Sequence, residues 1–471
     1  FSGTSYTLDL NGKTLEISRD QEMVGGSRMI IQDSDPEGKG CLKGLWDNET
    51  YRLRVSDGVL RVHSGMIKLP IDYPETPGLI YLTGGTFKEL RCLDDAYNVT
   101  QLLYNGYVYR GADGTLLKGE ELKNTASLQN VSVEQCGHTE VSVGGASQDI
   151  YTCPYCREDM QAVILDGEET IYYTEFTDAF NAAKTKRGCT VRILQKEVGL
   201  RAQTIKDAVF TVDLNGKTWK LWIDNYNYDV AVGAGAELTI CDTAGGGVVN
   251  AQRGTALSAR QGTLRITGGT YTGSAGGCVK QHTTEGTLII TGGTFDRVQS
   301  IAGDSPFTFL GEGLAFVFAD GTYAKPSDIS SVVAGMQVLY NVSVALAPFR
   351  IAEQPKPVSF YTTTPESERE ALKISIQSIG LDNGETVSVQ WKNEDGTAAT
   401  DAKELTITAG TCVDTVHLGA GTYYCEISYK GYVLQSDTVT VTETVCGHPS
   451  RNDDGKCSQC HCELAASVTL G

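Results

Sequence analysis

The 471-residue sequence lacks several features that would place it quickly in a functional class. No run of about 18 apolar residues is present, so no segment is expected to cross a membrane as a helix. Histidine is scarce, with six residues, and none stands beside a recognisable nucleophile pattern. Proline is also scarce, with 12 residues against 53 glycines, which predicts a folded chain rich in turns and not a disordered linker.

Positive charge is in short supply as well. The chain carries 39 lysines and arginines against 58 acidic residues, which gives a formal net charge of −19. Nucleic acids and anionic lipid surfaces are bound through clusters of basic residues, so we expect neither of them as a partner. The negative charge favours solubility but identifies no ligand.

What the sequence does contain is repetition. The hexapeptide that begins at Asp9 recurs intact at Asp213, and a Gly-Gly-Thr-aromatic tetrapeptide occurs three times. The tightest internal match pairs residues 262–271 with residues 286–295, at an offset of 24. Apolar and polar residues alternate within each copy, as in a strand with one buried face. The repeat therefore predicts an all-β chain that contains tandem right-handed parallel β-helices.

The two copies of this arrangement begin differently but end alike. Residues 174–188 predict a helix that caps the second β-helix, because the apolar core of an end rung needs a cover. The first copy has no counterpart, and we expect the natural protein to extend before Phe1. Both copies end with Asn-Val-Ser-Val, at Asn130 and Asn341, which we interpret as a structural turn and not as a glycosylation site.

From about residue 348 the periodicity changes. Several short strand-like runs between residues 358 and 443 predict one immunoglobulin-like β-sandwich. Trp391 stands where such a domain has its core tryptophan, and Tyr423 precedes Cys425 by two positions, as in a tyrosine corner. The usual bridge between the sheets lacks one cysteine. A Cys412–Cys425 disulfide and two free core thiols both remain open.

Two clusters of cysteine and histidine repeat one pattern. In the first, a Cys-x-His element is followed after 14 residues by a Cys-x-x-Cys turn. Three thiolates and one imidazole suit a closed tetrahedral zinc site, which is structural because it leaves no position for water. The predicted zinc ligands are Cys136, His138, Cys153 and Cys156 in the first site, and Cys446, His448, Cys457 and Cys460 in the second.

Disulfides are the alternative interpretation of these cysteines, natural outside the cell. Disulfides leave the histidines unexplained, and the three thiols of each cluster cannot all be paired with one another. In the second cluster Cys462 can supply a fourth thiol, and His461 can compete as a ligand. The zinc sites would fix the orientation of consecutive modules. The predicted domains are residues 1–134 and 161–347 for the β-helices, 135–160 for the first zinc knuckle, 348–444 for the sandwich, and 445–471 for the second knuckle and the start of a further module.

No catalytic residues are predicted. Asp94 and Asp95 form an acidic pair within the β-helical segments, and we interpret them as a solvated loop pair. His282, near Lys280 and Glu285, is interpreted as a turn or surface residue and not as a base. The alternative function is a carbohydrate-active enzyme, either a lyase or a glycoside hydrolase. Such an enzyme would need suitably placed acidic or basic groups in a β-helix groove.

An aromatic cluster is the best lead to a binding site. Rings on an edge anchor proteins and sugars, although burial in the core is the ordinary use of such rings. The candidate ligand-binding residues are Trp219, Trp222, Tyr226 and Tyr228.

The combination of these repeats, the Cys-Gly-His and Cys-x-x-Cys elements and the sandwich resembles the large modular surface proteins of Gram-positive gut bacteria. The resemblance implies an adhesin that is secreted or displayed on the cell wall, in a class with immunoglobulin-binding, superantigen-like members. The expected partner is then a host protein, such as immunoglobulin or mucin, or a glycan. A monomer is expected, and a structural stalk is a further alternative.

Overall fold

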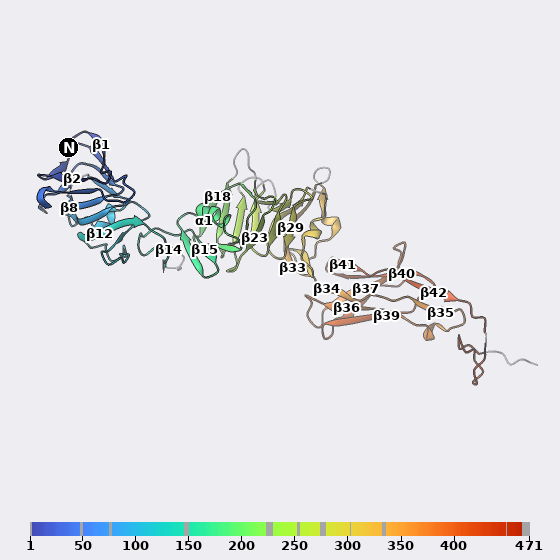
Figure 1. The fold of residues 1–471 in the computed structure, drawn as a ribbon. Coiled ribbons are helices and arrows are strands. Elements are labelled where there is room, and N and C mark those ends of the chain that lie inside the picture. The colour runs from blue at the N-terminus through green and yellow to red at the C-terminus, as the bar shows by residue number, and fades with distance from the viewer. Residues whose placement is uncertain are drawn as a thin grey trace, which may run out of the picture. The chain divides into compact units, whose positions relative to one another are not determined.

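The computed structural model describes residues 2–47, 50–74, 78–145, 150–222, 229–251, 255–273, 279–301, 303–331, 336–448 and 450–463. These residues form mostly β-strands, with one α-helix among them, and confirm the predicted all-β class (Figure 1). Two compact units are present: Phe1–Leu200 with Val209–Lys217, and Arg201–Ala208 with Thr218–Gly471. No described helix is both long and apolar enough to cross a membrane.

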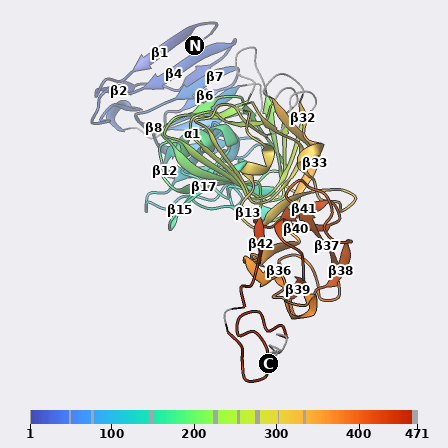
Figure 2. The same cartoon turned by 90° about the vertical axis from the view of Figure 1, so that its right-hand side faces the viewer.

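The first unit begins with two sheets. One sheet runs in the order β1 (Ser5–Asp9), β4 (Ser27–Gln32), β7 (Gly58–Val62) and β9 (Leu79–Leu82). Figure 2 shows β1, β4 and β7 side by side. The other sheet runs in the order β11 (Tyr107–Arg110), β12 (Ser127–Gln135), β10 (Thr86–Cys92), β8 (Met66–Tyr73), β5 (Cys41–Gly44) and β2 (Thr14–Ile17), with β3 (Gln21–Met23) and β6 (Leu53–Val55) attached.

The strands of the first sheet are parallel and in register, so that like side chains form columns. Ile31 of β4 lies beside Val62 of β7, which lies beside Leu82 of β9, and all three are fully buried. Alternate residues such as Arg61 point outward and are exposed. Each turn of the chain thus contributes one strand to the sheet and one layer to the core.

The repeated hexapeptide forms the same turn in both copies. Asn11 and Gly12 have φ angles of 43° and 71°, and Asn215 and Gly216 have φ angles of 50° and 72°. Lys13 donates its N–H to the carbonyl of Leu10 at 2.8 Å, which closes a two-residue turn. An Asn-Gly pair suits a turn in which both central residues have positive φ. The repetition of this peptide therefore has a structural cause.

The first unit continues with an antiparallel hairpin and a helix-covered sheet. The helix α1 (Phe176–Ala183) buries the four apolar residues predicted for its inner face, so the predicted helix is confirmed. The sheet order within this unit is β16-β15-β17-β20. The elements are β13 (Ser142–Gly144), β14 (Ile150–Thr152), β15 (Ala162–Asp166), β16 (Glu169–Tyr173), β17 (Cys189–Ile193), β18 (Glu197–Arg201) and β20 (Val209–Asp213).

The second unit holds further parallel strands. One set runs β23-β26-β29, and another runs β21-β24-β27-β30-β28-β25-β22-β19, with β33 joining β30, β31 and β32. The elements are β19 (Thr204–Ile205), β21 (Thr218–Trp222), β22 (Val230–Val232), β23 (Glu237–Cys241), β24 (Val248–Ala251), β25 (Leu257–Ala259), β26 (Thr263–Ile266), β27 (Thr270–Gly273), β28 (Val279–Gln281), β29 (Thr287–Ile290), β30 (Thr294–Ser300), β31 (Leu314–Phe318), β32 (Ser330–Ser331) and β33 (Gln337–Leu346).

The 24-residue offset found in the sequence equals the separation of paired residues in β26 and β29. Leu264 of β26 pairs with Leu288 of β29 in parallel. The aromatic residues of the Gly-Gly-Thr-aromatic motif stack in the same way, because the rings of Tyr271 and Phe295 lie 5.0 Å apart at an interplanar angle of 11°. The sequence match between the two copies therefore reflects their stacking.

Each parallel stack ends in antiparallel strands. In the first unit β12 pairs antiparallel with β10 and β11, and in the second β33 pairs antiparallel with β30 and β31. Asn130 and Asn341 lie in β12 and β33 with φ angles of 53° and 52°. Asparagine tolerates this left-handed conformation better than most residues. The shared Asn-Val-Ser-Val peptide is thus a structural feature of the two stack ends.

The last strands form two sheets around one core. Trp391 is buried there and donates its indole N–H to Asp414 at 2.8 Å, while the hydroxyl of Tyr423 donates to the carbonyl of Gly419 at 3.1 Å. Cys412 and Cys425 are free thiols, so the alternative with two unpaired core thiols holds. The sheets are β34 (Phe349–Glu353), β36 (Leu372–Ser378) and β39 (Thr411–Val416), and β35 (Val358–Tyr361), β42 (Val439–Thr444), β40 (Gly421–Tyr429), β37 (Thr386–Asn393) and β38 (Lys403–Thr406), with β41 (Tyr432–Gln435) on β40.

The first glycine of the Gly-Gly-Thr motif offers a matched test of stacking. A Cβ at Gly292 would lie 2.3 Å from the carbonyl oxygen of Thr267, so Gly292→Ala is expected to lower the free energy of unfolding by roughly 1–3 kcal/mol. At Gly268, the same position of the preceding copy, the nearest atom would be 3.4 Å away, so Gly268→Ala is the control. Urea unfolding measures both variants. Equal stability of the two would contradict the close approach of the backbones.

Candidate metal centres

The second cysteine cluster brings its four predicted ligands together. The ligand atoms of Cys446, His448, Cys457 and Cys460 all lie within 4.8 Å of one another. The Sγ atoms of Cys446 and Cys457 are 3.5 Å apart, and the Sγ of Cys460 is 3.5 Å from Nδ1 of His448. Thiolates bound to one tetrahedral ion at about 2.3 Å are separated by roughly 3.8 Å. The cluster therefore has the ligands and nearly the spacing to hold one metal ion.

The local backbone of this cluster is organised by hydrogen bonds to sulfur. The N–H groups of His448 and Gln459 each donate at 3.4 Å to a sulfur, of Cys446 and Cys457 respectively. Backbone N–H donors, first that of Cys460, lower the thiol pKa of Cys457 to about 7. Since a metal binds the thiolate, these donors favour the form of the side chain that can coordinate.

In the first cluster the three thiols lie close together, but the predicted ligand His138 is not part of that group. The ligand atoms of Cys136, Cys153 and Cys156 lie within 4.8 Å of one another, with 3.5 Å between the sulfurs of Cys136 and Cys153. Cys153 accepts hydrogen bonds from the other two thiols, which lower its pKa. His138 instead forms a group with Cys156 and Glu158.

Glu158 is a candidate ligand that the sequence analysis missed. Nε2 of His138 lies 3.6 Å from a carboxylate oxygen of Glu158, and this buried nitrogen makes no hydrogen bond within the described residues. A carboxylate beside a ligating histidine commonly orients the ring or enters the coordination itself. The first centre thus has three thiols close enough to share one ion, and His138 and Glu158 lie beside one of them, Cys156, as candidates for the fourth ligand.

The two clusters share an unusual backbone. His138 and His448 have φ angles of 46° and 50°, and Arg157 and His461, which follow the second cysteine of each Cys-x-x-Cys turn, have φ angles of 65° and 55°. His461 donates its N–H to the carbonyl of Cys457 at 3.0 Å, and Arg157 does the same to Cys153 at 2.9 Å. His461 thus occupies a turn position that an arginine fills in the first cluster, outside the group of four ligands.

No cysteine in the described part of the chain forms a disulfide. Cys462 lies at the margin of the second centre, where its sulfur is 3.2 Å from that of Cys460 and 3.7 Å from Nδ1 of His448. It is not part of the group whose four ligand atoms are mutually close. Cys462 is therefore an alternative ligand at that end of the site.

Two of the four residues of the candidate aromatic patch are described, and they differ in exposure. Trp219 has no exposed surface, so it presents no ring to a ligand, because its strand β21 turns this side chain into the core. Trp222 is half exposed. Tyr226 and Tyr228 lie outside the described residues. Trp46, which the sequence analysis did not single out, is 88% exposed with a φ of 58°.

The acidic pair behaves as the sequence predicts. Asp94 accepts a hydrogen bond from the N–H of Ala96 at 2.8 Å, and its carbonyl accepts another from Tyr97. It therefore shapes a turn.

A buried charge network that the sequence analysis did not predict lies near His282. Asp229 is almost fully buried, 3.0 Å from the guanidinium of Arg260 and 3.5 Å from the ammonium of Lys280. Burial, and then the nearby charge of Lys280, lower the pKa of His282. His282 is thus half-buried beside two cations and is not a plain surface residue.

No family model, curated protein or solved structure matches this chain.

Removal of one thiol tests the metal centres. Cys457 is fully buried among the ligands of the second cluster, so Cys457→Ser is expected to remove about one equivalent of metal per chain. Elemental mass spectrometry of the purified protein gives the metal content and identifies the ion. Cys412→Ser, at a buried thiol outside both clusters, is the control. An unchanged metal content in Cys457→Ser would exclude the second site.

The Asp229 network yields a stability prediction. Asp229→Asn removes the buried counter-charge of Lys280, which is mostly buried, and of Arg260, which is partly exposed, and we expect a loss of roughly 3 kcal/mol in the free energy of unfolding. Asp166→Asn removes one partner of the more exposed Lys186 and should cost less than about 1 kcal/mol. Urea unfolding compares the two, and a similar loss in both would argue against a buried network.

Proposed function

We propose that this chain is a noncatalytic binding protein, secreted or displayed on a cell surface, whose recognition surface is the outward face of a parallel sheet. The observation that carries the proposal is the face of β1, β4, β7 and β9, where exposed arginines and partly exposed aliphatic and tyrosine side chains line a groove. Such side chains are typical of surfaces that recognise a partner.

We further propose that the parallel stacks are right-handed β-helices and that the last domain is immunoglobulin-like. The in-register columns and the repeated end strands support the first assignment. Two layers around a buried Trp391, with the Tyr423 hydroxyl bonded to a carbonyl four residues upstream, support the second. Such modules build a scaffold on which outward side chains can vary while the core is kept.

Zinc is the ion that we propose for both cysteine clusters. Thiolate and imidazole ligands in a closed four-ligand set suit it. Each cluster has a small core of its own, which in the second consists of three cysteines with little else packed against them. Segments with so little apolar core commonly depend on a metal to fold. Their cysteines would then have a structural role.

The clusters of acidic and metal-ligating side chains in the described residues fit a binding protein better than a glycoside hydrolase. Within the described residues, every group of three or more metal-ligating side chains contains cysteine. The acidic pair at Asp94 forms a turn. The expected partner is a host protein, such as immunoglobulin or mucin, or a glycan carried by one.

Binding to host molecules tests the proposal directly. We expect the metal-loaded chain to bind an immunoglobulin, a mucin or a glycan on an array in surface plasmon resonance, and to release no reducing sugar or unsaturated product from the glycans it binds. The urea-unfolded chain is the control for nonspecific capture. Turnover of a bound polysaccharide, or the absence of binding to every host ligand, would defeat the proposal.

A further inference from the structure

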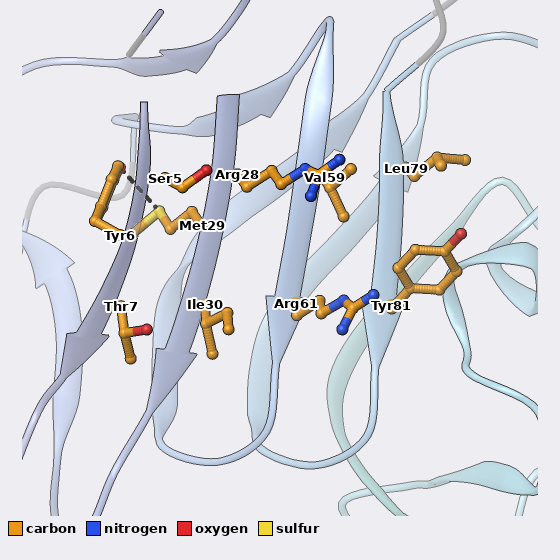
Figure 3. Close-up of a pocket in the computed structure, with 10 residues that line it drawn as sticks. All are labelled: Ser5, Tyr6, Thr7, Arg28, Met29, Ile30, Val59, Arg61, Leu79 and Tyr81. Atoms are coloured by element: carbon orange, nitrogen blue, oxygen red, sulfur yellow. Dashed lines mark hydrogen bonds between the residues drawn. The ribbon is translucent and has the colours of Figure 1, made fainter. Parts of the chain in front are cut away.

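The groove on the first unit is built from two rows of side chains that cross four strands. Figure 3 shows the rows on the outward face of the sheet. The register places them directly: Ser5, Arg28, Val59 and Leu79 form one row, and Thr7, Ile30, Arg61 and Tyr81 form the other. The groove has a volume of about 570 Å³. Each row contributes one hydroxyl on β1, one arginine and two further side chains that are apolar or aromatic.

The two arginines of the groove lack an acidic partner. Neither the Arg28 nor the Arg61 guanidinium forms an ion pair with a described residue, and both side chains are exposed. Arg61 lies over the ring of Tyr81, with 5.6 Å from its guanidinium carbon to the ring centre. This contact holds Arg61 over the groove and leaves its N–H donors available. In a chain with a net charge of −19, two neighbouring unpaired arginines stand out.

The equivalent sheet face in the second unit differs from the groove in its charge. Arg265 of β26 corresponds to Arg61 in the repeat, and its guanidinium pairs with the carboxylate of Glu237 on β23 at 2.6 Å. The position that corresponds to Glu237 is Arg28 in the first unit. The same register position on the sheet is therefore occupied by a neutralising acid, Glu237, in the second unit and by a second cation, Arg28, in the first.

We propose that this groove binds a carboxylated saccharide, such as a uronic acid or sialic acid residue of a glycan. The proposal rests on the binding function argued above and names its ligand class. Two guanidinium groups match the planar carboxylate of such a sugar with paired N–H donors. Ser5 and Thr7 offer hydroxyls, while Ile30, Val59 and Leu79 offer an apolar strip for the C–H face of the ring.

An acidic peptide fits this surface less well. The groove lies on the face of the sheet, where the backbone groups of β4 and β7 already bond to strands on both sides. A peptide laid across it would find no backbone donors or acceptors, whereas β-strand addition uses a free edge. Ten residues line this groove, whereas an interface with a folded protein takes in about 20 to 30, so among the proposed partners the groove by itself suits a glycan. A sugar can keep its other hydroxyls in solvent.

Charge reversal tests the proposal with little risk to the fold. Arg28→Glu recreates the pairing of Glu237 with Arg265, so this variant should fold and pair with Arg61. Isothermal titration of the metal-loaded full chain with tetragalacturonate and with 3′-sialyllactose is expected to show binding that Arg28→Glu weakens roughly tenfold or more. Arg61→Gln should weaken it similarly. Arg187→Glu, which changes the net charge equally at an exposed site, should leave it unchanged.

The other outcomes are each decisive. Lactose, which lacks a carboxylate, should not bind. Binding of poly-L-glutamate that depends on Arg28, without binding of either acidic sugar, would assign the groove to an acidic peptide and overturn the proposal. So would binding of an acidic sugar that Arg28→Glu leaves intact. If no acidic sugar binds while a host ligand binds the chain elsewhere, the groove assignment fails and the binding function stands.

Discussion

The parallel hydrogen-bonded register between successive turns of the chain is the constraint on which the rest depends. A single strand cannot bury its own apolar face, and Ile31 is fully buried in one column with Val62 and Leu82 of the neighbouring strands. The register also fixes which residues face outward, and therefore which side chains meet in the groove. The core and the proposed binding surface are thus the two faces of one sheet, and the same alternation of residues sets both.

Much of the scaffold could be predicted because repetition reports register directly. The offset of 24 residues predicts that Leu264 lies beside Leu288, and the apolar spacing predicts the α1 helix; both are confirmed. The antiparallel end strands could not be predicted in the same way. Their pairing depends on contacts between β12 and β10 that no local pattern encodes, although the shared Asn-Val-Ser-Val peptide marks the position.

The candidate sites were predictable where ligands are close in sequence. The second cluster gathers all four predicted ligands, since short Cys-x-His and Cys-x-x-Cys elements leave little freedom. In the first, the same elements bring together the three thiols, but His138 lies near Glu158, a contact in space that the sequence pattern does not report. The arginine groove was missed for the same reason. Arg28 and Arg61 are 33 positions apart and become neighbours only through the strand register.

The two units carry different residues, Glu237 and Arg28, at equivalent register positions, and this difference has a wider consequence. Because backbone pairing and the inward columns hold the stack together, an outward residue can be replaced with little disturbance of the layer beneath it. The same scaffold then carries a self-neutralised face in one copy and a cationic face in the other. In the proposed binding protein, single outward substitutions after duplication of a repeat would change which ligand a copy binds while its core stays the same.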